Sequence, residues 1–298
     1  MSESQVYFFD TNVVVDWLYK EVSPHGDLLK RFVDSLKKDQ CAVFGVTLTE
    51  IETIINDAYN VMAHVIHEEV LSKTDWDSLS AEERLRTLNE IKKEFEEKYE
   101  EIRERYYRGR IRRSEVRLLL AKRFFTDLGE RLVELGGEDV RRHFSLTQRP
   151  RDIIDYVRSV KSRVADKCTI VYDVGKPAIE DDITARKKEL LSKGIENYIK
   201  KLKEKGYKKS PSRTDTMIFT NLYLLIDKNV YPKVVFVTDD VDFKGMYESV
   251  IEYLNGVASR GGQEGDGLTS YAIEVREALV NRLSIMSVSE VLASYSNK

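Results

Sequence analysis

The sequence has little cysteine and no long apolar run. Among its 298 residues only Cys41 and Cys168 are cysteines, so neither a disulfide framework nor a paired-cysteine zinc motif is expected. No stretch reaches the roughly 20 apolar residues that a membrane-spanning helix needs. The first ten residues, MSESQVYFFD, lack the basic and apolar regions of a secretory signal. These absences predict a cytoplasmic protein that does not associate with a membrane.

A large excess of either charge is also missing. The 48 lysine and arginine residues oppose 51 aspartate and glutamate residues, which gives a formal net charge of -3. Because the chain as a whole is not a polycation, any binding of nucleic acid would have to come from local basic patches. The hydrophobic content of 42% fits a globular protein with a substantial core.

Short apolar segments with the composition of buried strands cover residues 6–9, 41–46 and 234–238, and an apolar helix is expected within residues 211–230. Alternation of strands and helices predicts an α/β fold with a central parallel sheet. Each strand ends in or near an acid, and the helix begins with one. The four acids at these junctions are Asp10, Glu50, Asp215 and Asp240. Since parallel strands have their carboxyl ends on one edge, we expect these side chains to converge.

Asp10 alone has a second explanation, because aspartate is a favoured N-cap and an apolar segment over residues 13–18 could begin a helix. The recurrence of acids at the other junctions favours a shared site. Four carboxylates in one cleft cannot all stay ionised without counter-charge. Oxygen-only ligands suit Mg²⁺ or Mn²⁺. The usual chemistry of such sites is phosphodiester hydrolysis assisted by two ions.

The middle of the chain has a different character. A capping-box motif, Ser80 to Glu83, precedes a long charged helix with one apolar seam, and a second apolar helix follows over residues 114–135. We predict a helical insertion subdomain over residues 57–205. Residues 1–56 and 206–298 would then form one discontinuous α/β domain.

Basic residues cluster at ERYYRGRIRR, residues 104–113. This cluster could line a nucleic-acid channel, with tyrosines available for stacking on bases. A solvated helix face is the alternative, because glutamates are interleaved with the basic residues. The lysine-rich residues 186–209 are a second candidate with the same alternative. The candidate substrate-binding arginines are Arg108, Arg110, Arg112, Arg113 and, beside Asp215, Arg213.

Four segments, in order, resemble the PIN-domain nucleases, a family that includes the toxins of many prokaryotic toxin–antitoxin pairs. The segments are FFDTNVVVDWL, VTLTEIETII, TDTMIFTNLYLL and VVFVTDDVDF. By this resemblance Asp10, Glu50, Asp215 and Asp240 are the catalytic and metal-binding acids, and Asp242 is an auxiliary acid. Asn12 and Thr238 match polar positions beside the acids that would contact substrate. The resemblance covers less than half of the chain, and the helical insertion departs from the compact toxins.

The resemblance implies a Mg²⁺- or Mn²⁺-dependent endoribonuclease with two ions in its site and products that carry a 5′-phosphate. RNA is favoured over DNA as substrate, and a protein antitoxin or a second copy of the chain is an expected partner. Two alternatives stay open. One is a structure-specific, flap-type DNA nuclease, because related flap nucleases also carry helical insertions. The other is a catalytically idle PIN fold that serves as an RNA-binding or assembly module.

Overall fold

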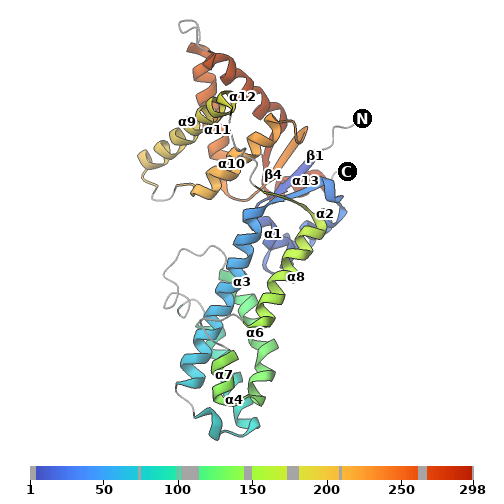
Figure 1. Cartoon of the computed structure of the whole chain (residues 1–298), viewed down its shortest axis with the longest axis vertical. Coiled ribbons are helices and arrows are strands. Elements are labelled where there is room, and N and C mark those ends of the chain that lie inside the picture. Colours follow the sequence, from blue (N-terminus) through green and yellow to red (C-terminus); the bar gives the residue numbers. More distant parts are fainter. Residues whose placement is uncertain are drawn as a thin grey trace. The chain divides into compact units, whose positions relative to one another are not determined.

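The structure is a computed structural model that describes residues 5–72, 75–98, 101, 114–143, 150–172, 181–207, 210–260 and 267–296. It divides into two compact units (Figure 1). The sheet unit contains Met1–Thr47 and Ala165–Lys298, and the helical unit contains Leu48–Val164. The second boundary lies at Val164 rather than at residue 205, because helix α9 (Asp182–Glu204) packs with the sheet unit.

Five parallel strands form the centre of the sheet unit. They are β1 (Gln5–Phe9), β2 (Cys41–Phe44), β3 (Thr169–Val171), β4 (Lys233–Val237) and β5 (Leu283–Met286). The order across the sheet is β3-β2-β1-β4-β5, and every neighbouring pair is parallel. The predicted α/β fold with a central parallel sheet is therefore confirmed. The chain passes from β1 outward to β3 and then returns to the other side of β1, so the strand order reverses between β1 and β4.

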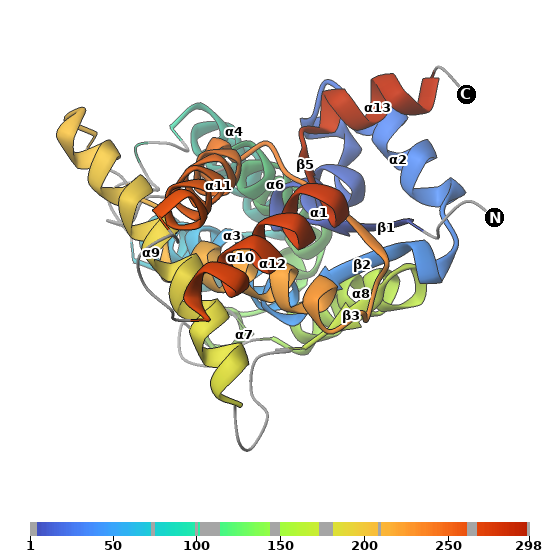
Figure 2. The ribbon, with the colours of Figure 1, turned by 90° about the horizontal axis from the view of Figure 1, so that it is seen from above.

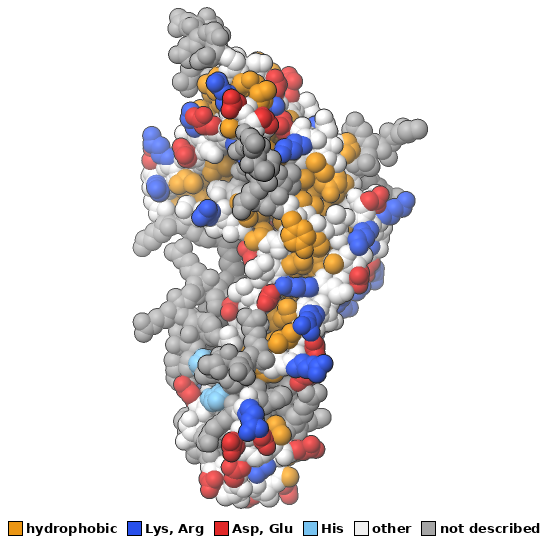
Figure 3. All heavy atoms as spheres, in the orientation of Figure 1, with side chains coloured by type: hydrophobic (Ala, Val, Ile, Leu, Met, Phe, Trp, Pro, Cys, Tyr) orange, Lys and Arg blue, Asp and Glu red, His pale blue; other side chains and the backbone are white. Residues whose placement is uncertain are grey.

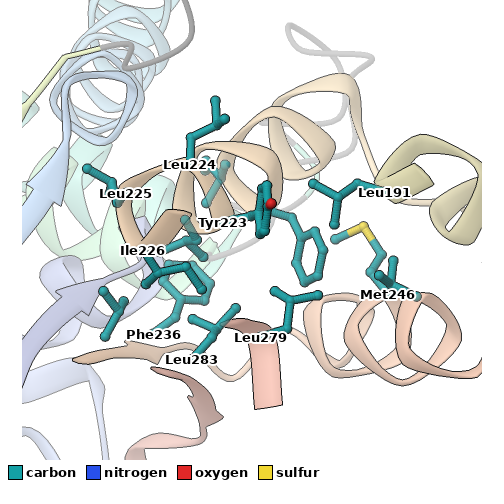
Figure 4. Packing of buried hydrophobic residues seen from close by; sticks show 14 of the residues in the cluster. Leu191, Tyr223, Leu224, Leu225, Ile226, Phe236, Met246, Leu279 and Leu283 are labelled. Carbon is teal, nitrogen blue, oxygen red and sulfur yellow. The ribbon is translucent and has the colours of Figure 1, made fainter. Parts of the chain in front are cut away.

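Helices lie on both faces of this sheet (Figure 2). Besides α9, the sheet unit contains α1 (Thr11–Leu18), α2 (Gly26–Ser35), α10 (Arg213–Asp227), α11 (Val241–Arg260), α12 (Leu268–Arg282) and α13 (Val288–Ser296), with 3-10 turns η1 (Lys20–Val22) and η2 (Lys38–Gln40). Helices α9 to α12 cover one face and share a buried apolar cluster with alternate strand residues. Leu191 of α9, Tyr223 of α10 and Met246 of α11 belong to it (Figure 4).

The other face of the sheet packs against α2 and α13. Tyr7 of β1 meets Phe32 of α2 edge-on, with ring centroids 5.1 Å apart, and Phe32 meets Tyr295 of α13 at 5.3 Å. Successive side chains of β1 point to opposite faces: Val6 and Phe8 are buried under α9 to α12, whereas on the other face Phe9 is buried and Gln5 and Tyr7 are partly exposed. Both faces of the sheet are therefore covered by helices, which explains why strands β1, β2 and β4 have the apolar composition that the sequence analysis recognised.

The helical unit contains most of α3 (Gly45–Val65), a π-helical turn η3 (Ile66–Leu71), a 3-10 turn η4 (Trp76–Ser78), α4 (Ala81–Glu97), α6 (Ser114–Glu134), α7 (Gly137–His143) and most of α8 (Arg151–Lys167). The predicted capping box at Ser80 is present, and Ser80 N–H donates to Glu83 Oε2 at 2.9 Å. Helices α4 and α6 pack through Phe95 and Phe125, whose ring centroids are 5.8 Å apart. Among the helices described, none is both long enough and apolar enough to cross a membrane.

The two cysteines form a single disulfide, which the sequence analysis did not predict. Cys41 opens β2, and Cys168 immediately precedes β3, the strand that pairs with β2. Their Cα atoms are 4.6 Å apart, although 127 positions separate them in sequence. Two cysteines this far apart form no recognisable spacing motif, and only the pairing of the two strands brings them together.

Candidate functional site

Asp10 is the single residue between β1 and α1. Its backbone N–H donates to Val237 O of β4 at 3.1 Å, which holds it beside the end of that strand. Its Oδ1 accepts a 2.7 Å hydrogen bond from Thr11 N–H, so Asp10 is the N-cap of α1. Its Oδ2 accepts a 2.8 Å bond from the hydroxyl of Thr238. Asp10 therefore caps α1 and also bonds to a polar residue at the end of β4. It is only 8% exposed.

Thr238 links the ends of two neighbouring strands. It follows β4, is 4% exposed, and donates its backbone N–H to Met286 O of β5 at 2.9 Å. Its hydroxyl donates a hydrogen bond to Asp10 Oδ2 and accepts a 3.0 Å bond from the backbone N–H of Asp240. This one hydroxyl therefore holds Asp10 and Asp240 in a fixed relation to each other.

Asp240 and Asp242 continue the same run of hydrogen bonds. Asp240 directly precedes α11, and its Oδ1 accepts from Asp242 N–H at 3.1 Å. Asp242 lies in the first turn of α11 and is 8% exposed. Its Oδ1 accepts a 3.1 Å bond from the hydroxyl of Tyr198 on α9. We call the connected residues Asp10, Thr238, Asp240, Asp242 and Tyr198 the acidic network.

The negative charge of the acidic network is offset by backbone dipoles. Asp10 caps α1, and Asp240 and Asp242 lie at the start of α11, where helix N-termini favour negative charge. Burial and the negative charges of Asp242, Asp240 and Glu248 raise the pKa of Tyr198 above its usual value. Tyr198 therefore stays protonated and acts as a donor to the carboxylate beside it.

Asp239, between two members of the network, has a different role. Its Oδ1 accepts a 3.0 Å bond from Val288 N–H at the start of α13. The side chain is exposed. Asp239 therefore fixes α13 against the end of β4, and its exposed carboxylate is a natural control for Asp240, which is partly buried.

Asp215, the third predicted acid, is engaged in the cap of its own helix. Its Oδ2 accepts from Ser212 N–H at 2.7 Å, and Ser212 Oγ accepts from Asp215 N–H at 3.1 Å, which together form a capping box on α10. Arg213 is the exposed first residue of the same helix, and Asn12 is a partly exposed residue in the first turn of α1. Their predicted contacts with substrate stay predictions.

Glu50, the remaining predicted acid, lies in the helical unit. It is the sixth residue of α3, which starts at Gly45 directly after β2. Its neighbour Glu52 pairs with Lys161 of α8 at 2.5 Å in the same unit. The candidate arginines Arg108, Arg110, Arg112 and Arg113 lie outside the described residues.

In the described parts of the chain, no three His, Cys, Asp or Glu side chains form a group that could hold a metal ion. The acidic network is extended, because backbone N–H groups and two hydroxyls separate its carboxylates. On the face shown in Figure 3, basic and acidic side chains are intermixed. Tyr198 is a member of the network that the sequence analysis missed.

No protein-family model, curated protein or solved structure matches this chain.

Proposed function

We propose that this protein is a Mg²⁺- or Mn²⁺-dependent nuclease with a PIN-like sheet domain, and that its substrate is RNA. The observation that carries the proposal is the link through the Thr238 hydroxyl, which donates to the Asp10 carboxylate and accepts from the backbone N–H of Asp240. They follow β1 and β4, the two strands between which the strand order reverses. In open α/β sheets, ligands bind outside the carboxyl ends of the strands at that reversal.

The acidic network suits a hard cation, because every side-chain atom in it that could coordinate a metal ion is an oxygen. Mg²⁺ is often bound through only one or two carboxylates, with waters and substrate phosphates completing its coordination. Asp10 and Asp240 would supply those carboxylates. A site that needs only two carboxylates is compatible with the extended form of the network. Glu50 and Asp215 would join them if the resemblance to the PIN-domain nucleases holds. A bound ion of this kind lowers the pKa of a coordinated water and offsets the charge of a phosphate.

The residues of this chain would orient the carboxylates and place the substrate. Thr11 N–H and the Thr238 hydroxyl each hold one oxygen of Asp10, so its carboxylate has a defined rotation. A defined rotation lowers the reorganisation needed when a cation and a phosphate bind. Asn12 and Arg213 would contact the phosphate backbone, and the arginines at 108–113 would extend that contact along the strand.

A DNA substrate is the second candidate, and the helical unit is the feature that favours it. Related flap-type DNA nucleases also carry helical insertions, as the resemblance implies. The proposal also includes a protein antitoxin or a second copy of the chain as partner, and a cytoplasmic location. An idle PIN fold that only binds RNA is the alternative outside the enzymes.

The test compares cleavage of labelled single-stranded RNA and flap DNA with and without Mn²⁺. We expect Asp10→Asn and Asp240→Asn each to lower kcat/KM on RNA by at least about 100-fold, because each removes a proposed metal-holding carboxylate. Asp239→Asn is the matched control and should stay within about threefold, because the asparagine side-chain oxygen can still accept the hydrogen bond from Val288 N–H. Cleavage of flap DNA but not RNA would transfer the proposal to DNA.

Calorimetric titration with Mn²⁺ completes the test. If neither polymer is cleaved and Mn²⁺ binding releases no heat, the nuclease proposal is wrong and the idle module is favoured. If Asp239→Asn is as inactive as Asp240→Asn, the acidic network is not the site.

A further inference from the structure

Tyr198 enters the acidic network from a helix that is remote from it in sequence. The residue lies in the second half of α9, within the lysine-rich segment that the sequence analysis assigned to the insertion. Its hydroxyl donates to Asp242 Oδ1 at 3.1 Å, across 44 positions of sequence. Asp242 in turn donates its backbone N–H to Asp240 Oδ1. The tyrosine hydroxyl is therefore connected through one residue to a proposed metal-holding carboxylate.

The surface of α11 is shaped to admit the tyrosine ring. Gly245 lies on α11, three residues after Asp242. A Cβ atom at position 245 would lie 2.4 to 2.6 Å from Cε2, Cζ and Oη of Tyr198, which is closer than real contacts allow. Any side chain at this position would displace the ring from Asp242. The contact between Tyr198 and Asp242 therefore requires glycine at position 245.

One turn earlier, α9 is also held closely against α11. A Cβ atom at Gly194 would lie 2.7 Å from Cα of Val250, so the two backbones nearly touch there. The hydroxyl of Ser249 donates to Gly194 O at 3.0 Å and is buried. Because Gly194 precedes Tyr198 by four residues, this contact sets both the height and the rotation of the tyrosine relative to α11.

We propose that Tyr198 is a positioning residue for the metal-holding carboxylates, acting through Asp242 on Asp240. The inference rests on the proposed nuclease function and extends it to a residue of α9. The partners that orient ligating carboxylates through hydrogen bonds contribute to metal affinity even though they do not touch the ion. In the alternative, Tyr198 only fills space between α9 and α11, and then its hydroxyl has no bearing on metal binding.

The experiment removes the hydroxyl and keeps the ring. In Tyr198→Phe, we expect the Mn²⁺ concentration for half-maximal RNA cleavage, and the Mn²⁺ dissociation constant from calorimetry, to rise by about 10- to 100-fold. KM for RNA at saturating Mn²⁺ should change by less than about threefold, because the hydroxyl orients a carboxylate and does not bind substrate. Gly245→Ala keeps the hydroxyl but displaces the ring, and should shift Mn²⁺ affinity in the same direction.

Tyr223→Phe is the matched control. The Tyr223 hydroxyl also donates to an aspartate, Asp227 Oδ1 at 2.9 Å, within the sheet unit but outside the acidic network. A general effect of losing a tyrosine–aspartate bond would appear in both variants as a lower melting temperature. Of these two tyrosine variants, only Tyr198→Phe should change the Mn²⁺ dependence.

The outcomes separate the inference from the function on which it rests. If the wild type cleaves RNA with Mn²⁺ and Tyr198→Phe has the same Mn²⁺ dependence as Tyr223→Phe, the positioning role is overturned while the nuclease function stands. If the wild type neither binds Mn²⁺ nor cleaves nucleic acid, both are overturned. A selective shift in Tyr198→Phe together with Gly245→Ala supports the inference.

Discussion

At the scale of single residues, the hydroxyl of Thr238 has the most consequence for the candidate site. Among the hydrogen bonds described, it is the group that joins Asp10 to Asp240, and it is almost completely buried. A buried carboxylate that loses a donor retains the cost of its desolvation. Thr238 therefore matters to the stability of the fold as well as to the orientation of the acids.

We predict that Thr238→Val lowers the free energy of unfolding by about 1 to 3 kcal/mol, because Asp10 Oδ2 loses its hydroxyl donor in a buried place. Thr238→Ser keeps the hydroxyl and should lose less than half as much. Urea unfolding followed by circular dichroism gives both values. A Thr238→Val variant as stable as the wild type would contradict the role of the hydroxyl, because valine keeps the methyl group of threonine and lacks only its hydroxyl.

The residues of the site differ in how far the sequence could predict them. Asp10 and Asp240 could be singled out because an acid at the end of an apolar strand is visible in composition alone. The cap that Asp215 forms depends on local geometry, so the sequence located the acid but not what it bonds. Tyr198 left no signal, because its contact with Asp242 exists only after α9 has packed on α11.

At the scale of elements, α9 is the helix whose place was least predictable. Its lysines indicated a solvated or nucleic-acid-binding face, whereas Leu190, Leu191 and Ile195 are buried in the core of the sheet unit. Two of its lysines pair with acids of neighbouring helices, Lys187 with Asp227 at 3.0 Å and Lys201 with Glu252. The strands could be predicted because they are short and apolar, but an amphipathic helix does not encode which surface it covers.

We predict that Gly194→Ala lowers the free energy of unfolding by about 1 to 3 kcal/mol, because the new methyl group would overlap the α11 backbone at Val250. Ser192→Ala, at an exposed position of the same helix, is the control and should be neutral within about 0.5 kcal/mol. Thermal and urea unfolding measure both. A neutral Gly194→Ala would show that α9 does not approach α11 this closely.

At the scale of the whole molecule, the disulfide lies where the chain leaves and re-enters the sheet unit. The chain departs after Thr47, shortly beyond Cys41, and returns at Ala165, shortly before Cys168. Disulfides are rare in the cytosol of organisms that live at moderate temperature, but common inside hyperthermophiles. A cytoplasmic location, which stays a prediction, is therefore most compatible with a heat-adapted source, and the high content of charged residues points the same way.

We predict that reducing the disulfide lowers the melting temperature markedly. In the chain-entropy account, closing a loop over a separation of 127 residues stabilises the fold by about 5 kcal/mol. The double variant Cys41→Ser with Cys168→Ser should melt at the temperature of the reduced wild type and should not respond to dithiothreitol. A wild type that melts identically with and without reductant, and that carries two free thiols by mass spectrometry, would contradict the disulfide.

The bond between the two sulfurs makes the intervening polypeptide a covalently closed ring that contains the entire helical unit. A protease that cuts once inside this ring nicks the molecule without dividing it, and the fragments separate on a denaturing gel only after reduction. The disulfide would keep β2 and β3 tethered through such damage, so the nicked protein would retain both strands on that side of β1.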